Sequence, residues 1–219
     1  MDQPSHIDIR RFSFDEFVSF LFDRGAPPDS SHRDRWYYHL EVEFNPEAIC
    51  AYYVQLFRRP DFLSPRFTKL QLDEGFWAIQ SPNLTCSVYK LIHDSNLTLS
   101  AKGGCIRSMT DLFERLFSKE SLDTSVQMWW DSLCYDWHCG NRKRERGGED
   151  KRLQDVFFQT LSTLLSSDSE ICQRAALHGL GHLHHPETTQ LIQQYIQQHP
   201  LLTKEWKDYA LSAARFEVL

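Results

Sequence analysis

Two histidines, His178 and His182, lie four residues apart in the segment His-Gly-Leu-Gly-His. In a helix this spacing places both imidazoles on one face, close enough to share a metal ion. A metal site needs a third ligand; His185 is the nearest candidate, and Cys172 lies on a different helical face. The segment lacks the glutamate that follows the first histidine of metalloprotease motifs. We therefore expect structural or solvent-facing histidines and no stoichiometric zinc, with a partner-binding surface or a metal site at His178 and His182 as alternatives.

Cysteine is the second residue type that could do chemistry. Cys134 and Cys139 flank His138, but this is not a standard zinc spacing, and no matching half occurs elsewhere. A nucleophilic Cys139 would need a positioned base, which the sequence does not identify. We expect core thiols, with a Cys-dependent enzyme using Cys134 or Cys139 as the alternative. Phosphate-loop, nucleophile-elbow and dinucleotide motifs are absent, so we predict no catalytic residue and no cofactor.

A basic run lies in the polar segment 141–152, which contains no large apolar residue. Six basic residues outnumber three acidic ones there, a local excess of +3. The composition predicts a solvated loop, with a contact to an acidic partner or a phosphate as the alternative.

Composition bounds the class of protein. The 219 residues are 41% hydrophobic and 13% aromatic, which excludes a disordered chain. The net charge of −6 opposes general nucleic-acid binding. No apolar run reaches the length of about 18 residues that a membrane span needs, and the N-terminus lacks the pattern of a signal peptide. We therefore expect a cytoplasmic protein with reduced cysteines.

The elements that must position these residues are predicted to be helices. In the segment 168–187, Cys172, Ala176, Leu180 and Leu183 form an apolar stripe at helical spacing, with Asp168 as the cap and Pro186 as the stop. Gly179 and Gly181 lie inside this pattern, where each costs about 1 kcal/mol relative to alanine. A neighbouring helix packed closely against the glycines would compensate.

A shift of 34 residues aligns Ala175–Leu180 with Tyr209–Ala214. A helix over 153–166, an Asp in the turn, Arg174, the Ala-Ala pair and the Leu-Gly ending together resemble a HEAT-type repeat. The second copy departs from that pattern, because Leu202 replaces the Asp and Asp208 replaces the Arg. The resemblance covers the last third of the chain and implies an α-solenoid there.

The N-terminal part, 1–140, is predicted to be irregularly helical. A capping box at Ser13–Glu16 begins the first helix, and further helices are expected over 46–59, 65–81, 84–93, 103–117 and 122–135. Residues 1–10 are predicted to be a loose tail, and 36–44 to be a short strand, a helix start or an extended connector. The expected fold is thus all-α, with nine or ten helices, an irregular region (1–140), a polar loop (141–152) and HEAT-like repeats (153–219).

The predicted function is a non-enzymatic module that binds a protein partner. Small acidic proteins with HEAT-like sequences resemble bacterial proteins that include immunity proteins, so the resemblance implies a toxin as one class of partner. On the inner helix of each pair, residues half a turn from Ala176 would face the concave groove. The expected partner-binding residues are Arg174, His178, His182, His185, Glu205 and Asp208. A metal-dependent or Cys-dependent enzyme is the alternative.

Overall fold

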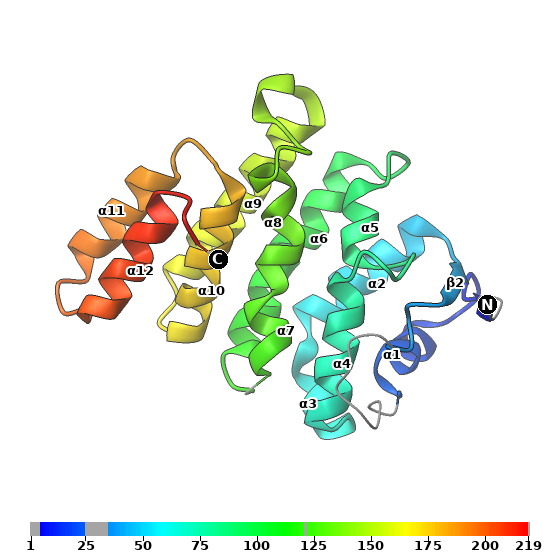
Figure 1. Ribbon diagram of the computed structural model, residues 1–219. Helices are drawn as coiled ribbons and strands as arrows, with labels where there is room; N and C mark the ends of the chain where they lie inside the picture. The colour runs from blue at the N-terminus through cyan, green and yellow to red at the C-terminus, as the bar shows by residue number, and fades with distance from the viewer. Residues whose placement is uncertain (1–4, 25–34, 121, 219) are drawn as a thin grey trace. The chain divides into compact units, whose positions relative to one another are not determined.

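The computed structural model describes residues 5–24, 35–120 and 122–218, and helices dominate these ranges (Figure 1). The all-α prediction is therefore confirmed. By their internal contacts the residues form two compact units, one of residues 1–112 and 122–126 and the other of residues 113–121 and 127–219. The polar segment 141–152, at which the sequence predicted a division, lies inside the second unit. In the described part of the chain, no helix is long and apolar enough to cross a membrane.

The first unit packs its helices around aromatic side chains. Its elements are β1 (Ser5–Asp8), α1 (Phe14–Phe22), β2 (Leu40–Glu43), α2 (Pro46–Arg58), η1 (Pro60–Phe62), α3 (Leu63–Arg66), α4 (Lys69–Gln80), α5 (Val88–His93), α6 (Leu99–Leu112) and most of α7 (Asp123–Gln127). Helix α2 packs on α6, and α1 packs on α4. The predicted capping box is present, since Ser13 and Glu16 bond to each other's backbone amides.

Several predictions for this unit were wrong in detail. Residues Ser5–Asp8 are not a loose tail, because they pair in parallel with Leu40–Glu43. The strand alternative for 36–44 is therefore correct over four residues. Ser5–Asp8 is mostly exposed and lacks an alternating apolar pattern, so no local signal indicated a partner strand. Gly103 does not open a helix; it lies inside α6, which begins at Leu99.

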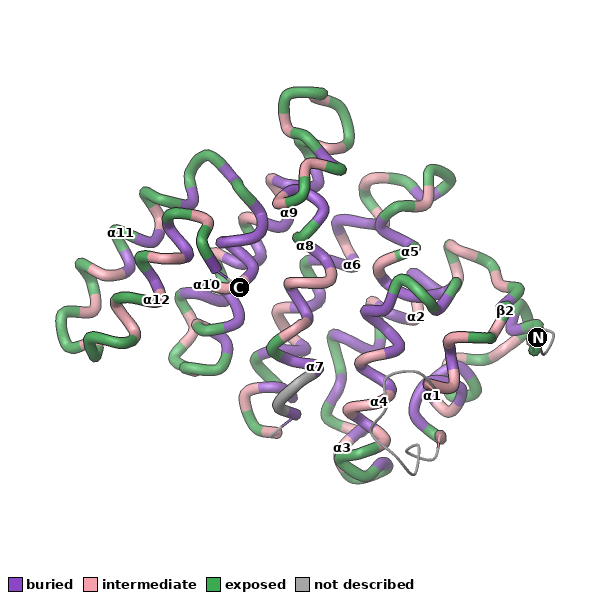
Figure 2. The backbone as a smooth tube through the Cα atoms, viewed as in Figure 1, coloured by how far each residue is buried: buried purple, intermediate pink, exposed green. Residues whose placement is uncertain are grey.

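The second unit is built around one central helix. Its elements are the π-helical turn η2 (Phe113–Phe117), α8 (Trp129–His138), the 3-10 turn η3 (Arg144–Arg146), α9 (Gly148–Leu165), α10 (Glu170–Leu183), α11 (Thr188–Gln198) and α12 (Lys204–Ala214). Helix α10 packs against α8, α9 and α12 (Figure 1). Figure 2 shows α10 largely buried, whereas α11 and α12 keep exposed faces. The described residues after 153 contain four helices and no strand, as predicted, and α12 begins 34 residues after α10.

Two boundaries in this unit differ from prediction. The polar loop is shorter, because α9 begins at Gly148, and its cations are paired: Arg142 with Asp150, and Arg144 with Asp155. The cap of α10 is Ser169, one residue after the predicted Asp168. The helix ends at Leu183. Its C-cap is His184, which has a left-handed conformation and lies two residues before Pro186.

Gly179 of α10 marks close helix packing, as the sequence indicated, whereas Gly181 lies against Val218 in the segment after α12. A Cβ at Gly179 would lie 2.8 Å from Trp130 Cβ on α8 and 2.9 Å from Leu161 Cδ2 on α9. Real Cβ atoms do not approach other atoms this closely, so a larger residue would push the helices apart. Gly179 thus lets α10 lie against two neighbours at once, which brings the polar side chains of α8 and α10 together.

Candidate functional site

A polar stripe runs along α10 on the side that faces α8 and α12. Arg174, His178 and His182 lie at successive turns of this helix. On α8, Asp131, Tyr135 and His138 lie at similar spacing. Since α8 and α10 pack together in the second unit, the two stripes share one seam.

Three potential ligand atoms converge in this seam. His182 Nε2 lies 3.0 Å from Asp131 Oδ1 and 3.2 Å from His178 Nε2. His178 Nε2 lies 4.0 Å from the same Asp131 oxygen. Among the residues that the structure describes, this is the one group of three potential metal ligands whose ligand atoms all lie within 4.8 Å of one another. We call it the Asp131 cluster: Asp131, His178 and His182.

The dimensions of the cluster suit a metal ion. A point equidistant from the three atoms lies about 2.0 Å from each and in their plane, which matches Zn–N and Zn–O bond lengths. Tetrahedral coordination requires in addition that the 4.0 Å separation of His178 Nε2 and Asp131 Oδ1 shortens when the ion binds. His182 is buried, whereas the Asp131 side chain is 26% exposed, so the cluster opens to solvent on its carboxylate side. Three protein ligands with one open position are the arrangement of zinc sites that bind water or substrate.

The charges of the cluster also suit a metal ion. The hydrogen bond with His182 lowers the pKa of Asp131 and outweighs the opposing effect of burial. Burial, together with the neighbouring His182, lowers the pKa of His178. At neutral pH these groups are therefore a carboxylate and a neutral imidazole, the forms in which the two residue types bind metals.

Tyr209 of α12 holds His178 from the opposite side. Its hydroxyl lies 3.0 Å from His178 Nδ1. When Nδ1 donates its proton to this hydroxyl, the lone pair of Nε2 points toward Asp131 and His182. Partners of this kind fix the tautomer and orientation of metal-binding histidines. The Tyr209 ring also lies beneath Arg174, with the guanidinium carbon 5.5 Å from the ring centre.

Aromatic rings close the other end of the seam. The rings of Tyr135 and His138 stand edge-on to His182, at centroid distances of 5.5 and 5.2 Å. His138 Nδ1 lies 3.0 Å from His184 Nε2, and His184 stacks on Phe216. These contacts limit the rotation of the His182 ring.

The structure places the predicted partner-binding residues in three separate environments. Arg174, His178 and His182 share the seam with Asp131, whereas His185 contacts Asp155 and Phe158 on α9. Glu205 and Asp208 are exposed on α12, and no described contact links them to the cluster.

The expectation that the histidines face out into a groove was wrong for His182 and His185, whereas His178 is half-buried. His182 and His185 are each 2% exposed. The reason is that α8 lies along the His182 face of α10 and α9 lies beside His185. Sequence reasoning also missed Asp131 and Tyr209; the polar spacing of Asp131, Tyr135 and His138 is the signal that could have found the first of them.

The cysteine alternative receives no support from the geometry. Cys134 is fully buried, and burial raises the pKa of its thiol well above the usual value, which disfavours the nucleophilic thiolate. Cys139 is exposed, and its described hydrogen bond is a weak one to the Asp136 carbonyl oxygen, at 3.9 Å.

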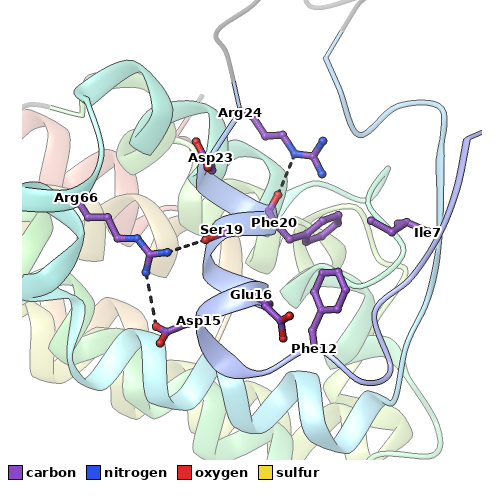
Figure 3. Close-up of a pocket in the computed structure, with 9 residues that line it drawn as sticks. All are labelled: Ile7, Phe12, Asp15, Glu16, Ser19, Phe20, Asp23, Arg24 and Arg66. Atoms are coloured by element: carbon purple, nitrogen blue, oxygen red, sulfur yellow. Dashed lines mark hydrogen bonds and ion pairs between the residues drawn. The ribbon is translucent and has the colours of Figure 1, made fainter.

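A hollow of about 450 Å³ lies on α1 in the first unit (Figure 3). Four of its charged side chains, those of Asp15, Glu16, Arg24 and Arg66, already have local partners. Glu16 belongs to the capping box, Arg66 bonds Ser19 and Asp15, and Arg24 donates to the Phe20 carbonyl oxygen. Figure 3 shows these groups spread around the hollow rather than directed at one point. The hollow is therefore a weaker candidate for a ligand site than the Asp131 cluster, whose potential ligand atoms converge.

Comparison of the chain with protein-family models, with curated proteins and with solved structures gives no match.

Proposed function

We propose that the protein binds one divalent transition-metal ion at the Asp131 cluster and uses the open side of that ion to hold a small ligand or a water molecule. The observation that carries the proposal is the convergence of three ligand atoms from two helices on one point. The third ligand, which the sequence alone did not supply, is Asp131. This revises the expectation of a protein without zinc.

The donor atoms favour zinc over magnesium or calcium. Two imidazole nitrogens and one carboxylate oxygen are donors that zinc and its neighbours accept, whereas magnesium and calcium prefer oxygen ligands throughout. Imidazole donors alone do not distinguish zinc from nickel or copper, so the ion is identified by measurement.

The surrounding packing supports a functional ion rather than a structural one. Trp130, Leu161 and Leu180 are fully buried beside the cluster, so apolar contacts already join α8, α9 and α10. Structural zinc sites usually have four protein ligands and supply much of the folding energy. Because apolar packing already holds these helices together, the ion is not needed for folding. With only three protein ligands, it can bind an exogenous group at its fourth position.

The test is a zinc titration of the purified protein, monitored by competition with a chromophoric chelator, together with elemental analysis after dialysis. We expect one zinc ion per chain. Asp131→Asn should abolish this binding, whereas Asp155→Asn should preserve it. Asp155 is a matched control because it also contacts a buried histidine, His185, but lies outside the cluster. A parent protein without bound zinc, or equal binding by both variants, would refute the proposal.

A second candidate function, binding of a protein partner, is supported by a different surface. Leu201, in the turn between α11 and α12, is 96% exposed beside an open cavity of about 390 Å³ that Trp206 also lines. Trp206 is half-buried at this cavity, and tryptophan is among the residue types enriched at the energetic centres of protein contacts. If the partner is a toxin, as the repeat resemblance implies, the product of a toxin-like gene next to this one should bind the parent and lose affinity for Leu201→Asp. Equal affinity would exclude this surface.

A further inference from the structure

We infer that the ligand of the Asp131 cluster carries an oxyanion, a phosphate or a carboxylate, which the metal ion and Arg174 bind together. This inference depends on the proposed metal site and specifies what that site accepts. It rests on the placement of Arg174, on the role of Tyr209 and on the charge balance of the seam.

Arg174 is an available cation. Its side chain is exposed, and among the described residues it forms no ion pair, although acidic side chains outnumber basic ones in the chain. Its described contact is the stack on the Tyr209 ring. A guanidinium stacked on an aromatic ring keeps its planar fork of N–H donors for an oxyanion.

Tyr209 ties this cation to the cluster. One end of the residue, the hydroxyl, bonds His178, and its ring supports Arg174. The same side chain therefore fixes the orientation of a metal ligand and the position of the guanidinium. On α10, Arg174 and His178 are four residues apart, a rise of about 6 Å along one helix face. A ligand that coordinates the ion can extend an oxygen toward Arg174 over this distance.

The charge balance favours an anion once the metal is bound. A divalent ion beside the single carboxylate of Asp131 leaves a net positive centre, because both histidines bind as neutral ligands. Arg174 adds a second positive charge on the same face. Two positive centres at a partly open site attract an anionic ligand, and the bidentate geometry of arginine selects oxyanions over halides.

The experiment uses the full-length protein loaded with cobalt(II), whose visible absorption reports a change of ligands at the ion. Inorganic phosphate and acetate are titrated separately, so that the two sources of an oxyanion are distinguished. We expect at least one of them to change the spectrum saturably. Arg174→Gln should weaken that binding roughly 10- to 100-fold, the range expected for a charge-assisted hydrogen-bond pair. Cobalt affinity should stay unchanged.

Two further variants sharpen the test. Arg174→Lys keeps the charge without the fork and should fall between the parent and Arg174→Gln. Arg215→Gln removes an exposed arginine of the same unit that pairs with Glu217, and it should bind like the parent. Normal cobalt binding with no response to either anion, or with equal affinities for parent and Arg174→Gln, overturns the oxyanion inference alone. Failure of the parent to bind cobalt overturns the metal proposal as well.

Discussion

His182 and His185 lie three residues apart, and both are buried beside a carboxylate from a neighbouring helix. His182 Nε2 lies 3.0 Å from Asp131 on α8, and His185 Nε2 lies 3.1 Å from Asp155 on α9. By sequence, burial and distance to the acid, the two are almost equivalent. Their remaining contacts nevertheless give them different roles.

The hydrogen bonds of His185 are complete. Its Nδ1 accepts from the Glu187 amide, so its Nε2 donates to Asp155, and its ring stacks on Phe158 at 4.0 Å between centroids. Asp155 in turn pairs with Arg144. Both ring nitrogens of His185 therefore have a hydrogen-bond partner, and neither is left to bind a metal ion. This is the pattern of a histidine that fastens the turn after α10 to α9.

The contacts of His182 differ from those of His185 because they include potential metal ligands. Its Nε2 faces two other potential ligand atoms. Its buried Nδ1 has no hydrogen-bond partner in the described structure, unlike Nδ1 of His178, so the metal assignment depends on Nε2 alone. A buried histidine beside an acid is thus weak evidence for a site. The convergence of a third ligand atom is what separates the two.

The largest expected difference between the two histidines is in metal affinity. His182→Ala removes one of three ligands and should weaken zinc binding by more than about 100-fold. His185→Ala should leave zinc affinity within a few fold of the parent, and it should lower the free energy of unfolding by about 1–3 kcal/mol because it removes a buried ring together with its two hydrogen bonds. Chelator competition and thermal melting measure the two effects. Equal loss of zinc affinity in both variants would erase the distinction.

Tyr209→Phe tests whether the support of His178 matters. The change keeps the ring under Arg174 and removes the hydroxyl that bonds His178 Nδ1. Loss of such a supporting hydrogen bond typically weakens metal affinity by about 10- to 100-fold. Tyr195→Phe is the matched control, since Tyr195 bonds Gln173 and Trp206 elsewhere in the unit. A Tyr209→Phe variant with parental affinity would show that the hydroxyl does not orient the ligand.

Gly179→Ala tests whether close packing of α10 forms the cluster. The added Cβ would overlap Trp130 on α8 and Leu161 on α9, and the strain should cost about 1–3 kcal/mol of stability. Separation of α8 from α10 should also loosen the contact between Asp131 and His182, and so weaken zinc binding. Gly104→Ala, where a Cβ would meet nothing within 4 Å, is the control. If Gly179→Ala melts like the parent, the glycine is not needed for the approach of the helices.

The sequence predicted the helices well and the site only in part. Apolar spacing and the capping box at Ser13 are local signals, and each correctly indicated a helix. The pairing of Ser5–Asp8 with Leu40–Glu43 is a long-range contact between short polar segments, so no local pattern revealed it. The same limit applies to the cluster. The spacing of His178 and His182 was visible, but Asp131 lies 47 residues before His178 and Tyr209 lies 31 residues after it.

The smallest expected effect is the pH dependence that His185 contributes to stability. Burial lowers the pKa of His185, although the hydrogen bond with Asp155 opposes the shift; Arg144 and Glu187 are the other charged groups that act on it. In the unfolded chain its pKa is about 6.5, so below that pH the unfolded state binds the proton more readily than the folded state does. Stability should therefore be complete above pH of about 6.5 and fall as the pH drops. One such proton contributes up to about 1.4 kcal/mol per pH unit. Denaturant unfolding between neutral and mildly acidic pH, with a chelator present to exclude metal effects, measures this slope.

His185→Gln removes the titrating group while keeping a donor for Asp155, and it should reduce the slope. An unchanged slope would mean that His185 binds its proton equally readily in the folded and unfolded states, so that burial does not lower its pKa.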